Sequence, residues 1–85
     1  MFEVVYTKRA TKALARMSSA DRQRIQRALR QLAQDPRGAS LDTKPLRGRY
    51  GFRLRIGDWR VIYELDGEQL VILVLHIGVR GDVYK

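Results

Sequence analysis

A dense cluster of basic residues lies in the second half of the chain. Residues 44–60 contain a single acid, Asp58, and six basic side chains: Lys44, Arg47, Arg49, Arg53, Arg55 and Arg60. Arginine holds phosphate through a planar fork of N–H donors. Like charges on one sheet face repel each other unless an anion lies between them. The cluster therefore predicts a phosphate-binding site, with Tyr50, Phe52 and Tyr84 as possible base-stacking surfaces.

The residues alone leave several interpretations of these side chains open. Alternating Arg and apolar residues are also typical of an ordinary sheet that has one face exposed to solvent. The Arg side chains could therefore form a solvated face, a nucleic-acid-binding surface or a catalytic site. Arg22, Arg24, Arg27 and Arg30 suit a solvated helix face or a secondary phosphate contact. His76 suits a structural histidine better than an acid–base group, because it follows a run of apolar residues.

The composition of the whole chain narrows the classes of function. Of its 17 basic residues 13 are Arg, and with nine acids the formal net charge is +8, which favours a polyanionic partner such as nucleic acid. The absence of Cys excludes a disulfide framework, a thiolate nucleophile and a cysteine zinc site. A single His excludes a histidine-rich metal centre. We therefore expect no metal and no other cofactor.

The length and the apolar pattern predict one small domain that does not interact with a membrane. With 85 residues, the chain is expected to form a single domain over residues 1–85. Its longest apolar run, residues 70–75, is too short to cross a bilayer. The N-terminus has Glu3 early and its basic residues late, the reverse of a signal peptide. A cytoplasmic location is expected.

The first half of the chain predicts one strand followed by two helices. Residues 2–6 (FEVVY) are typical of a strand, and Thr7 is a candidate helix N-cap. Apolar residues recur at helical spacing from Ala10 to Met17 and again from Ile25 to Ala33. Ser18 resembles the start of a capping box, and residues 35–38 (DPRG) end the second helix. Residues 38–51 are expected to form a loop.

The second half predicts three strands joined by tight turns. Residues 52–56, 59–65 and 70–77 have strand patterns, separated by turns at residues 57–58 and 66–67. The order β-α-α-β-β-β predicts an α+β domain in which a three-stranded antiparallel meander carries the helical hairpin on one face. The first strand is expected to pair at an edge. Strand alternation then places Arg53, Arg55 and Arg60 on the open face, with His76 and Arg80 sharing one parity.

Three segments together resemble the RelE/ParE superfamily of bacterial toxins from type II toxin–antitoxin systems. They are residues 45–48 (PLRG), residues 52–64 (FRLRIGDWRVIYE) and residues 80–84 (RGDVY). The order and spacing of these segments are what make the resemblance specific. The resemblance as a whole extends over essentially the entire chain, and it is strongest to the RelE branch. The resemblance implies a RelE-like fold and cleavage of mRNA in the ribosomal A site.

The resemblance also implies roles for particular side chains. The implied catalytic group is Arg53, Arg55, Arg60, Arg80 and Tyr84. In that group Arg60 matches an Arg thought to stabilise the scissile phosphate, Arg80 a general acid or phosphate clamp, and Tyr84 a Tyr that stacks on the substrate. The expected RNA- and ribosome-binding set is Lys44, Arg47, Arg49, Arg22, Arg27 and Arg30.

The implied reaction is attack of a ribose 2′-hydroxyl on the adjacent phosphorus without a metal, giving a 2′,3′-cyclic phosphate and a 5′-hydroxyl. Arg53 and Arg55 occupy positions where RelE toxins often have Lys, and arginine stays protonated, so the general base remains open. His76 lies four residues before Arg80, whereas related toxins place a catalytic His near the tail.

The resemblance further implies partners and competing functions. A cognate antitoxin is expected to fold around this chain, and operator DNA is expected to be bound only through that antitoxin. The other expected partner is the ribosome with mRNA in its A site. Two alternatives stay open: a ParE-like poison of DNA gyrase, which is not an enzyme, and an RNA-binding homologue that has lost catalysis.

Overall fold

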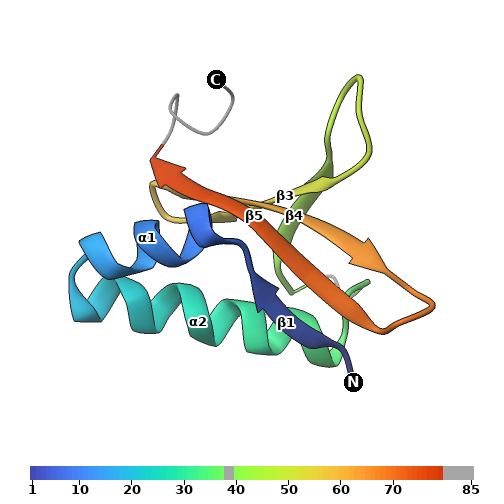
Figure 1. The fold of residues 1–85 in the computed structure, drawn as a ribbon, viewed down its shortest axis with the longest axis horizontal. Coiled ribbons are helices and arrows are strands. Elements are labelled where there is room, and N and C mark those ends of the chain that lie inside the picture. Colours follow the sequence, from blue (N-terminus) through green and yellow to red (C-terminus); the bar gives the residue numbers. More distant parts are fainter. Residues whose placement is uncertain (38–39, 80–85) are drawn as a thin grey trace.

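Two helices cover one face of a five-stranded sheet and leave the other face open (Figure 1). The computed structural model describes residues 1–37 and 40–79. Strand β1 (Glu3–Tyr6) precedes helices α1 (Lys8–Arg16) and α2 (Ser19–Gln34). Strands β2 (Asp42–Pro45), β3 (Phe52–Ile56), β4 (Trp59–Asp66) and β5 (Val71–Val79) follow. Neither helix in these ranges is long and apolar enough to span a membrane.

The helix boundaries follow the capping residues in the sequence. The Thr7 hydroxyl accepts a hydrogen bond from the Ala10 backbone N–H at 3.2 Å and begins α1. The Ser18 hydroxyl accepts one from the Asp21 backbone N–H, also at 3.2 Å, and begins α2. Each cap satisfies a donor that the first helical turn leaves without a partner. Asp35 ends α2, so both predicted helices are confirmed.

The strand order β1-β5-β4-β3-β2 confirms the α+β class and the antiparallel meander of β3, β4 and β5. Strand β1 pairs with β5 at an edge, as expected, and this pairing is parallel, so the sheet is mixed.

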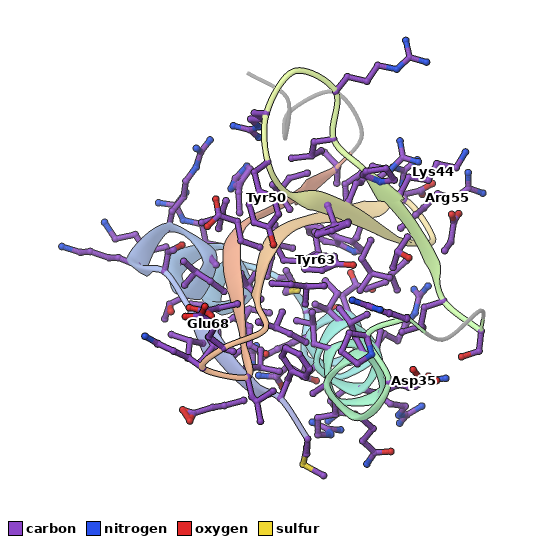
Figure 2. The ribbon with its side chains drawn as sticks, turned by 90° about the vertical axis from the view of Figure 1, so that its right-hand side faces the viewer. Asp35, Lys44, Tyr50, Arg55, Tyr63 and Glu68 are labelled. Atoms are coloured by element: carbon purple, nitrogen blue, oxygen red, sulfur yellow. The ribbon has the colours of Figure 1, made fainter. Side chains whose placement is uncertain are left out.

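The prediction that residues 38–51 form only a loop is wrong. Residues 42–45 form β2, which pairs antiparallel with the edge of β3. The segment DTKP lacks strand-forming residues apart from Thr43, and its Pro45 is tolerated because β2 is an edge strand. In Figure 2, Lys44 of β2 and Arg55 of β3 extend from neighbouring strands on the same side of the sheet.

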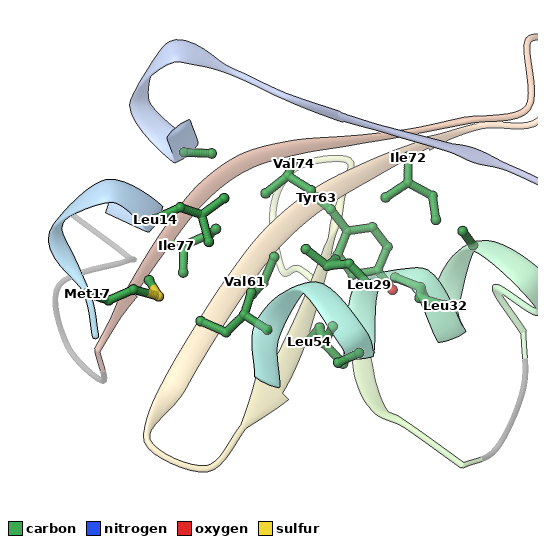
Figure 3. Close-up of a cluster of buried hydrophobic side chains, with 14 residues drawn as sticks. Leu14, Met17, Leu29, Leu32, Leu54, Val61, Tyr63, Ile72, Val74 and Ile77 are labelled. Carbon is green, nitrogen blue, oxygen red and sulfur yellow. The ribbon is translucent and has the colours of Figure 1, made fainter. Parts of the chain in front are cut away.

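The core lies between the sheet and both helices (Figure 3). Leu54 of β3 and Val61 and Tyr63 of β4 are buried against Leu29 and Leu32 of α2. This confirms that the apolar positions of β3 and β4 face the helices and that the Arg positions face away. Burial raises the pKa of the Tyr63 hydroxyl above its ordinary value of 10.0, because the ring lies in the core.

A β-bulge interrupts β5 halfway along its length. Ile62 is opposite His76, whereas the next residue of β4, Tyr63, is opposite Val74, so Leu75 is an extra residue. The helix-facing residues of β5 are consequently Ile72, Val74 and Ile77, all buried. Bulges bend and twist a strand locally. Beyond the bulge, the even-numbered residues of β5 lie on the open face. His76 and Gly78 are therefore on the open face.

Candidate nucleic-acid interface

Two rows of side chains cross the open face, one residue from each of four strands. The first row is Lys44, Arg53, Ile62 and His76. The second row is Asp42, Arg55, Arg60 and Gly78. Neighbouring strands lie about 4.8 Å apart, so Arg53 and His76, two strands apart, are separated by about 10 Å at the backbone. The predicted placement of Arg53, Arg55 and Arg60 on one face is thus found.

The first row forms the floor of a cavity of about 690 Å³. The remaining lining residues are Arg9, Pro45, Leu46, Arg47, Arg49 and Leu75. Five of the lining side chains are cationic, and no Asp or Glu is among the residues that line it. An arrangement of this kind concentrates positive potential in a concave site and favours a bound anion. Ile62, which is 1% exposed, supplies an apolar patch between Arg53 and His76.

The second row lies outside this cavity, and its two arginines have local partners. The Arg55 Nε atom lies 3.4 Å from a carboxylate oxygen of Asp42. The Arg60 guanidinium donates hydrogen bonds to the backbone carbonyls of Gly57 and Trp59, at 3.0 and 3.1 Å. Arg60 therefore folds back over the turn between β3 and β4. To reach a phosphate in the cavity it must leave these carbonyls.

The loop between β2 and β3 positions Arg47 and Arg49. The Leu46 backbone N–H donates to the Gly51 carbonyl at 2.9 Å and closes the loop. Gly51 has φ +136°, and a Cβ there would meet a methyl carbon of Leu46 at 3.0 Å and the Tyr63 carbonyl oxygen at 3.3 Å. Only glycine adopts this backbone conformation without strain. The sequence 45–48 (PLRG) is thus part of a closed loop that holds two cations at the rim of the cavity.

Helix α1 forms another wall of the cavity through Arg9. The Thr7 hydroxyl, besides capping α1, donates to the Leu75 carbonyl at the bulge at 2.8 Å. This bond ties the start of α1 to the residue before His76. A second hollow of about 420 Å³ shares Arg9 and His76 with the cavity and continues along Lys12 and Arg16. The cationic surface therefore extends from the sheet onto α1.

The remaining predicted site residues are Arg22, Arg27, Arg30, Arg80 and Tyr84. Arg22 donates to the carbonyls of Leu14 and Met17, at 2.9 and 3.2 Å, and so completes the C-terminus of α1. Arg27 and Arg30 are exposed on α2, in the layer on the opposite face of the sheet. Arg80 and Tyr84 lie outside the described residues.

Two of the three aromatic residues proposed for base stacking, Tyr50 and Phe52, do not line the cavity. Phe52 stacks on Tyr63 with ring centroids 5.5 Å apart and packs against the core. Tyr50 is 60% exposed, but its hydroxyl donates to the Leu65 carbonyl and its ring lines a hollow at the other end of the sheet. Tyr84 lies beyond the described part of the chain.

Sequence reasoning assigned no function to Arg9 and favoured a structural role for His76. The signal for Arg9 was the basic stripe Lys8, Arg9, Lys12 and Arg16 on the first helix. For His76 the sequence gave only a shared parity with Arg80, and it indicated neither the bulge at Leu75 nor that α1 would lie beside this residue. In residues 1–37 and 40–79, no three His, Cys, Asp or Glu side chains come together in a way that could hold a metal ion.

The opposite end of the open face carries acidic side chains. Glu64, Asp66 and Glu68 surround a hollow of about 540 Å³ with Val71 and Leu73. Asp66 accepts hydrogen bonds from the backbone N–H groups of Glu68 and Gln69, at 3.1 and 3.0 Å, and shapes the turn between β4 and β5. In Figure 2, Glu68 lies far from Lys44 and Arg55.

Residues 4–84 match the model of the ParE toxin family of type II toxin–antitoxin systems. The chain therefore belongs to that family, and the resemblance to the RelE/ParE superfamily is confirmed.

Individual relatives support this family assignment. The chain is 27% identical over 86 residues to a RelE-like toxin protein of Escherichia coli, covering 99% of this chain and 90% of that protein. It resembles RelE of the archaeal RelE–RelB complex from Pyrococcus horikoshii with a TM-score of 0.81 and 30% identity, over 94% of this chain and 96% of that one. The isolated RelE toxin of E. coli gives a TM-score of 0.73 with 26% identity, over 99% and 92% of the two chains.

Proposed function

We propose that this protein is a toxin that cuts mRNA on the ribosome. The observation that carries the proposal is the cavity floored by Lys44, Arg53, Ile62 and His76, which gathers cations from the sheet, the loop and α1. A cavity of about 690 Å³ has the size of a small-ligand site and holds part of an RNA strand, and its charge suits a sugar–phosphate link.

In the proposed reaction, the 2′-hydroxyl of one nucleotide attacks the phosphorus that follows it. The bond between that phosphorus and the 5′-oxygen breaks, leaving a 2′,3′-cyclic phosphate and a 5′-hydroxyl. Arg53, Lys44 and the loop arginines neutralise the charge that builds on the phosphate oxygens. The cavity also holds the strand so that the attacking and leaving oxygens are in line.

The other predicted residues have supporting parts in this proposal. Arg55 and Arg60, in the neighbouring row, extend the positive field, and Arg60 contacts phosphate once it leaves its carbonyl partners. Arg80 and Tyr84 follow β5 directly and supply the phosphate clamp and the stacking surface. Arg27 and Arg30, on the opposite side of the molecule, are free to contact ribosomal RNA, whereas Arg22 serves mainly to end α1.

The proposal includes an antitoxin partner and a cytoplasmic location, where ribosomes are found. RelE of P. horikoshii was solved as a complex with RelB. A chain with a net charge of +8 favours an acidic segment in such a partner. We expect the antitoxin to cover the cationic cavity and to carry the contacts to operator DNA.

The alternative is a ParE-like poison of DNA gyrase, and the match to the ParE toxin family favours keeping it. Such a protein traps gyrase on cleaved DNA and needs no catalytic group of its own. The concentration of five cations in one cavity favours RNA cleavage over this alternative.

Primer extension on cellular mRNA after induced expression separates these functions. The wild type is expected to produce new 5′ ends within codons of translated messages. Arg53→Ala and Arg80→Ala should lose most of these ends, while Gln23→Ala on α2 should keep them. A wild type that leaves mRNA intact and traps gyrase cleavage complexes in a supercoiling assay would instead establish the alternative. RNA binding without cut ends would indicate a homologue that has lost catalysis.

A further inference from the structure

We infer that His76 is the catalytic residue that accepts the proton of the attacking 2′-hydroxyl. The inference rests on the proposed RNA cleavage and supplies the group that the arginines cannot provide. Arginine stays protonated in proteins and so cannot accept a proton. A neutral imidazole has an unprotonated ring nitrogen and is the commonest proton acceptor in enzyme sites.

His76 lies on the floor of the cavity, in the same row as Arg53. The apolar side chain of Ile62 lies between these two residues. The separation of about 10 Å at the backbone leaves room for a sugar–phosphate link with the phosphate toward Arg53 and the ribose toward His76. This arrangement places a proton acceptor and a phosphate clamp on opposite sides of the reacting bond.

Three local features fix the position of His76. The bulge at Leu75 turns His76 to the open face, whereas regular alternation from the buried Val74 would have turned it toward the helices. The Thr7 hydroxyl holds the Leu75 carbonyl at 2.8 Å, and the Thr7 backbone N–H donates to the Val74 carbonyl at 3.0 Å. The Nδ1 atom of His76 is buried, and the side chain lines both the cavity and the neighbouring hollow.

The remaining candidates among the described residues are less suitable. Asp42 is the only acid in the two rows, and it pairs with Arg55 outside the cavity. Lys44 adjoins Arg53, and a lysine ammonium offers only donors and no acceptor. A neutral imidazole has one acceptor nitrogen.

The step balances with groups already named. The 2′-oxygen forms a bond to phosphorus while its proton passes to the acceptor nitrogen of neutral His76, giving an imidazolium. The bond from phosphorus to the 5′-oxygen breaks, and that oxygen takes a proton from water. The imidazolium then returns its proton to solvent, so no metal and no oxidant or reductant is consumed.

The charged groups facing His76 are all cations among the residues that line its two hollows. They are Arg9, Lys12 and Arg16 of α1, Lys44 of β2, Arg47 and Arg49 of the loop, and Arg53 of β3. Strand β4 contributes only the uncharged Ile62 and Trp59 to these hollows.

The test is single-turnover cleavage of mRNA bound to ribosomes, measured from pH 5.5 to 8.5 with wild type, His76→Gln and Leu73→Gln. Leu73→Gln introduces the same side chain on the open face of the same strand, outside the cavity. We expect His76→Gln to lower the rate at pH 7 by about 100-fold or more while ribosome binding is unchanged. The wild-type rate should rise with pH as the proton acceptor loses its proton, and this rise should be absent in His76→Gln.

Each outcome has a defined meaning. Wild type that does not cut removes the proposed function and the inference with it. Wild type that cuts, together with a His76→Gln variant at the wild-type rate, overturns the inference and leaves the proposed cleavage intact. A slow His76→Gln variant that keeps the pH dependence of the wild type assigns His76 only a structural role. Circular dichroism melting of each variant shows whether the fold is preserved.

Discussion

The open face of the sheet has a cationic half and an acidic half, and they meet at the bulge in β5. In the cationic half, Lys44, Arg53 and the loop arginines surround a cavity that no carboxylate of residues 1–37 or 40–79 lines. In the acidic half, Glu64, Asp66 and Glu68 surround a hollow with apolar strand residues. The same strands β4 and β5 run through both halves.

The difference shows that local placement, and not net charge alone, defines the site of a basic protein. The formal charge of +8 predicts an anionic partner but gives no position for it. The bulge supplies the position, because it changes the parity of β5 between Leu73 on one side and His76 on the other. We expect RNA to bind at the cationic half only, with the acidic half repelling the strand and so helping to orient it.

The largest expected effect comes from removing the central cation of the cavity. Arg53→Ala should lower single-turnover cleavage of ribosome-bound mRNA by about 100-fold or more, the size typical for loss of a group that stabilises transition-state charge. Glu64→Ala, on the open face of β4 in the acidic half, should leave the rate at the wild-type value. Equal losses in the two variants would show that the halves do not differ in function.

The next effect concerns the two turns that frame these halves. Gly51→Ala should destabilise the protein by about 1–3 kcal/mol, because φ is +136° and the added Cβ meets Leu46 and the Tyr63 carbonyl. Gly67→Ala, in the turn of the acidic half, meets nothing within 4 Å and should change stability little. Urea unfolding measures both free energies, and a fully stable Gly51→Ala would refute the role given to this loop.

A smaller change is expected at the boundary between the halves. Thr7→Val removes the cap of α1 and the bond to the Leu75 carbonyl, and should lower the free energy of unfolding by about 1–2 kcal/mol. Thr7→Ser keeps the hydroxyl and should retain most of this stability. If both variants melt at the same temperature, the hydroxyl does not hold the bulge in place.

The smallest effect is expected at the rim of the cavity. Arg47→Ala and Arg49→Ala should each weaken RNA binding modestly and reduce the slope of log affinity against log salt by about 0.7, the value for one phosphate contact on a single strand. Glu68→Gln should leave that slope unchanged. Fluorescence anisotropy at several salt concentrations measures it, and a slope that depends on Glu68 but not on the arginines would reverse the assignment of the two halves.

Most of the fold was predictable because its signals are local. The caps Thr7 and Ser18, the apolar periodicity of both helices and the alternation of β3 each depend on neighbouring residues. Strand β2 was missed because residues 42–45 have little strand propensity and are ordered by pairing with β3. The bulge was missed because β5 is apolar on both faces, which hides a change of parity.

The site was only partly predictable, since its parts come from distant segments. Alternation correctly placed Arg53, Arg55 and Arg60 on one face. It could not show that Arg55 and Arg60 bind Asp42 and backbone carbonyls, because those contacts depend on side-chain conformations. Arg9 and His76 approach each other through the bond of Thr7 to Leu75, which are 68 residues apart in the sequence. The predictions for Arg80 and Tyr84 remain predictions.

The most direct test of the central claim is an NMR titration of the ¹⁵N-labelled protein with a short RNA that carries 2′-O-methyl groups and cannot be cut. We predict that backbone amide signals shift in the loop of residues 46–51 and around His76, with Arg53 Nε–H among the side chains that respond. Signals of the turn at residues 66–70 should stay in place. Shifts confined to that turn or to α2 would contradict the claim that the cationic half of the open face binds RNA.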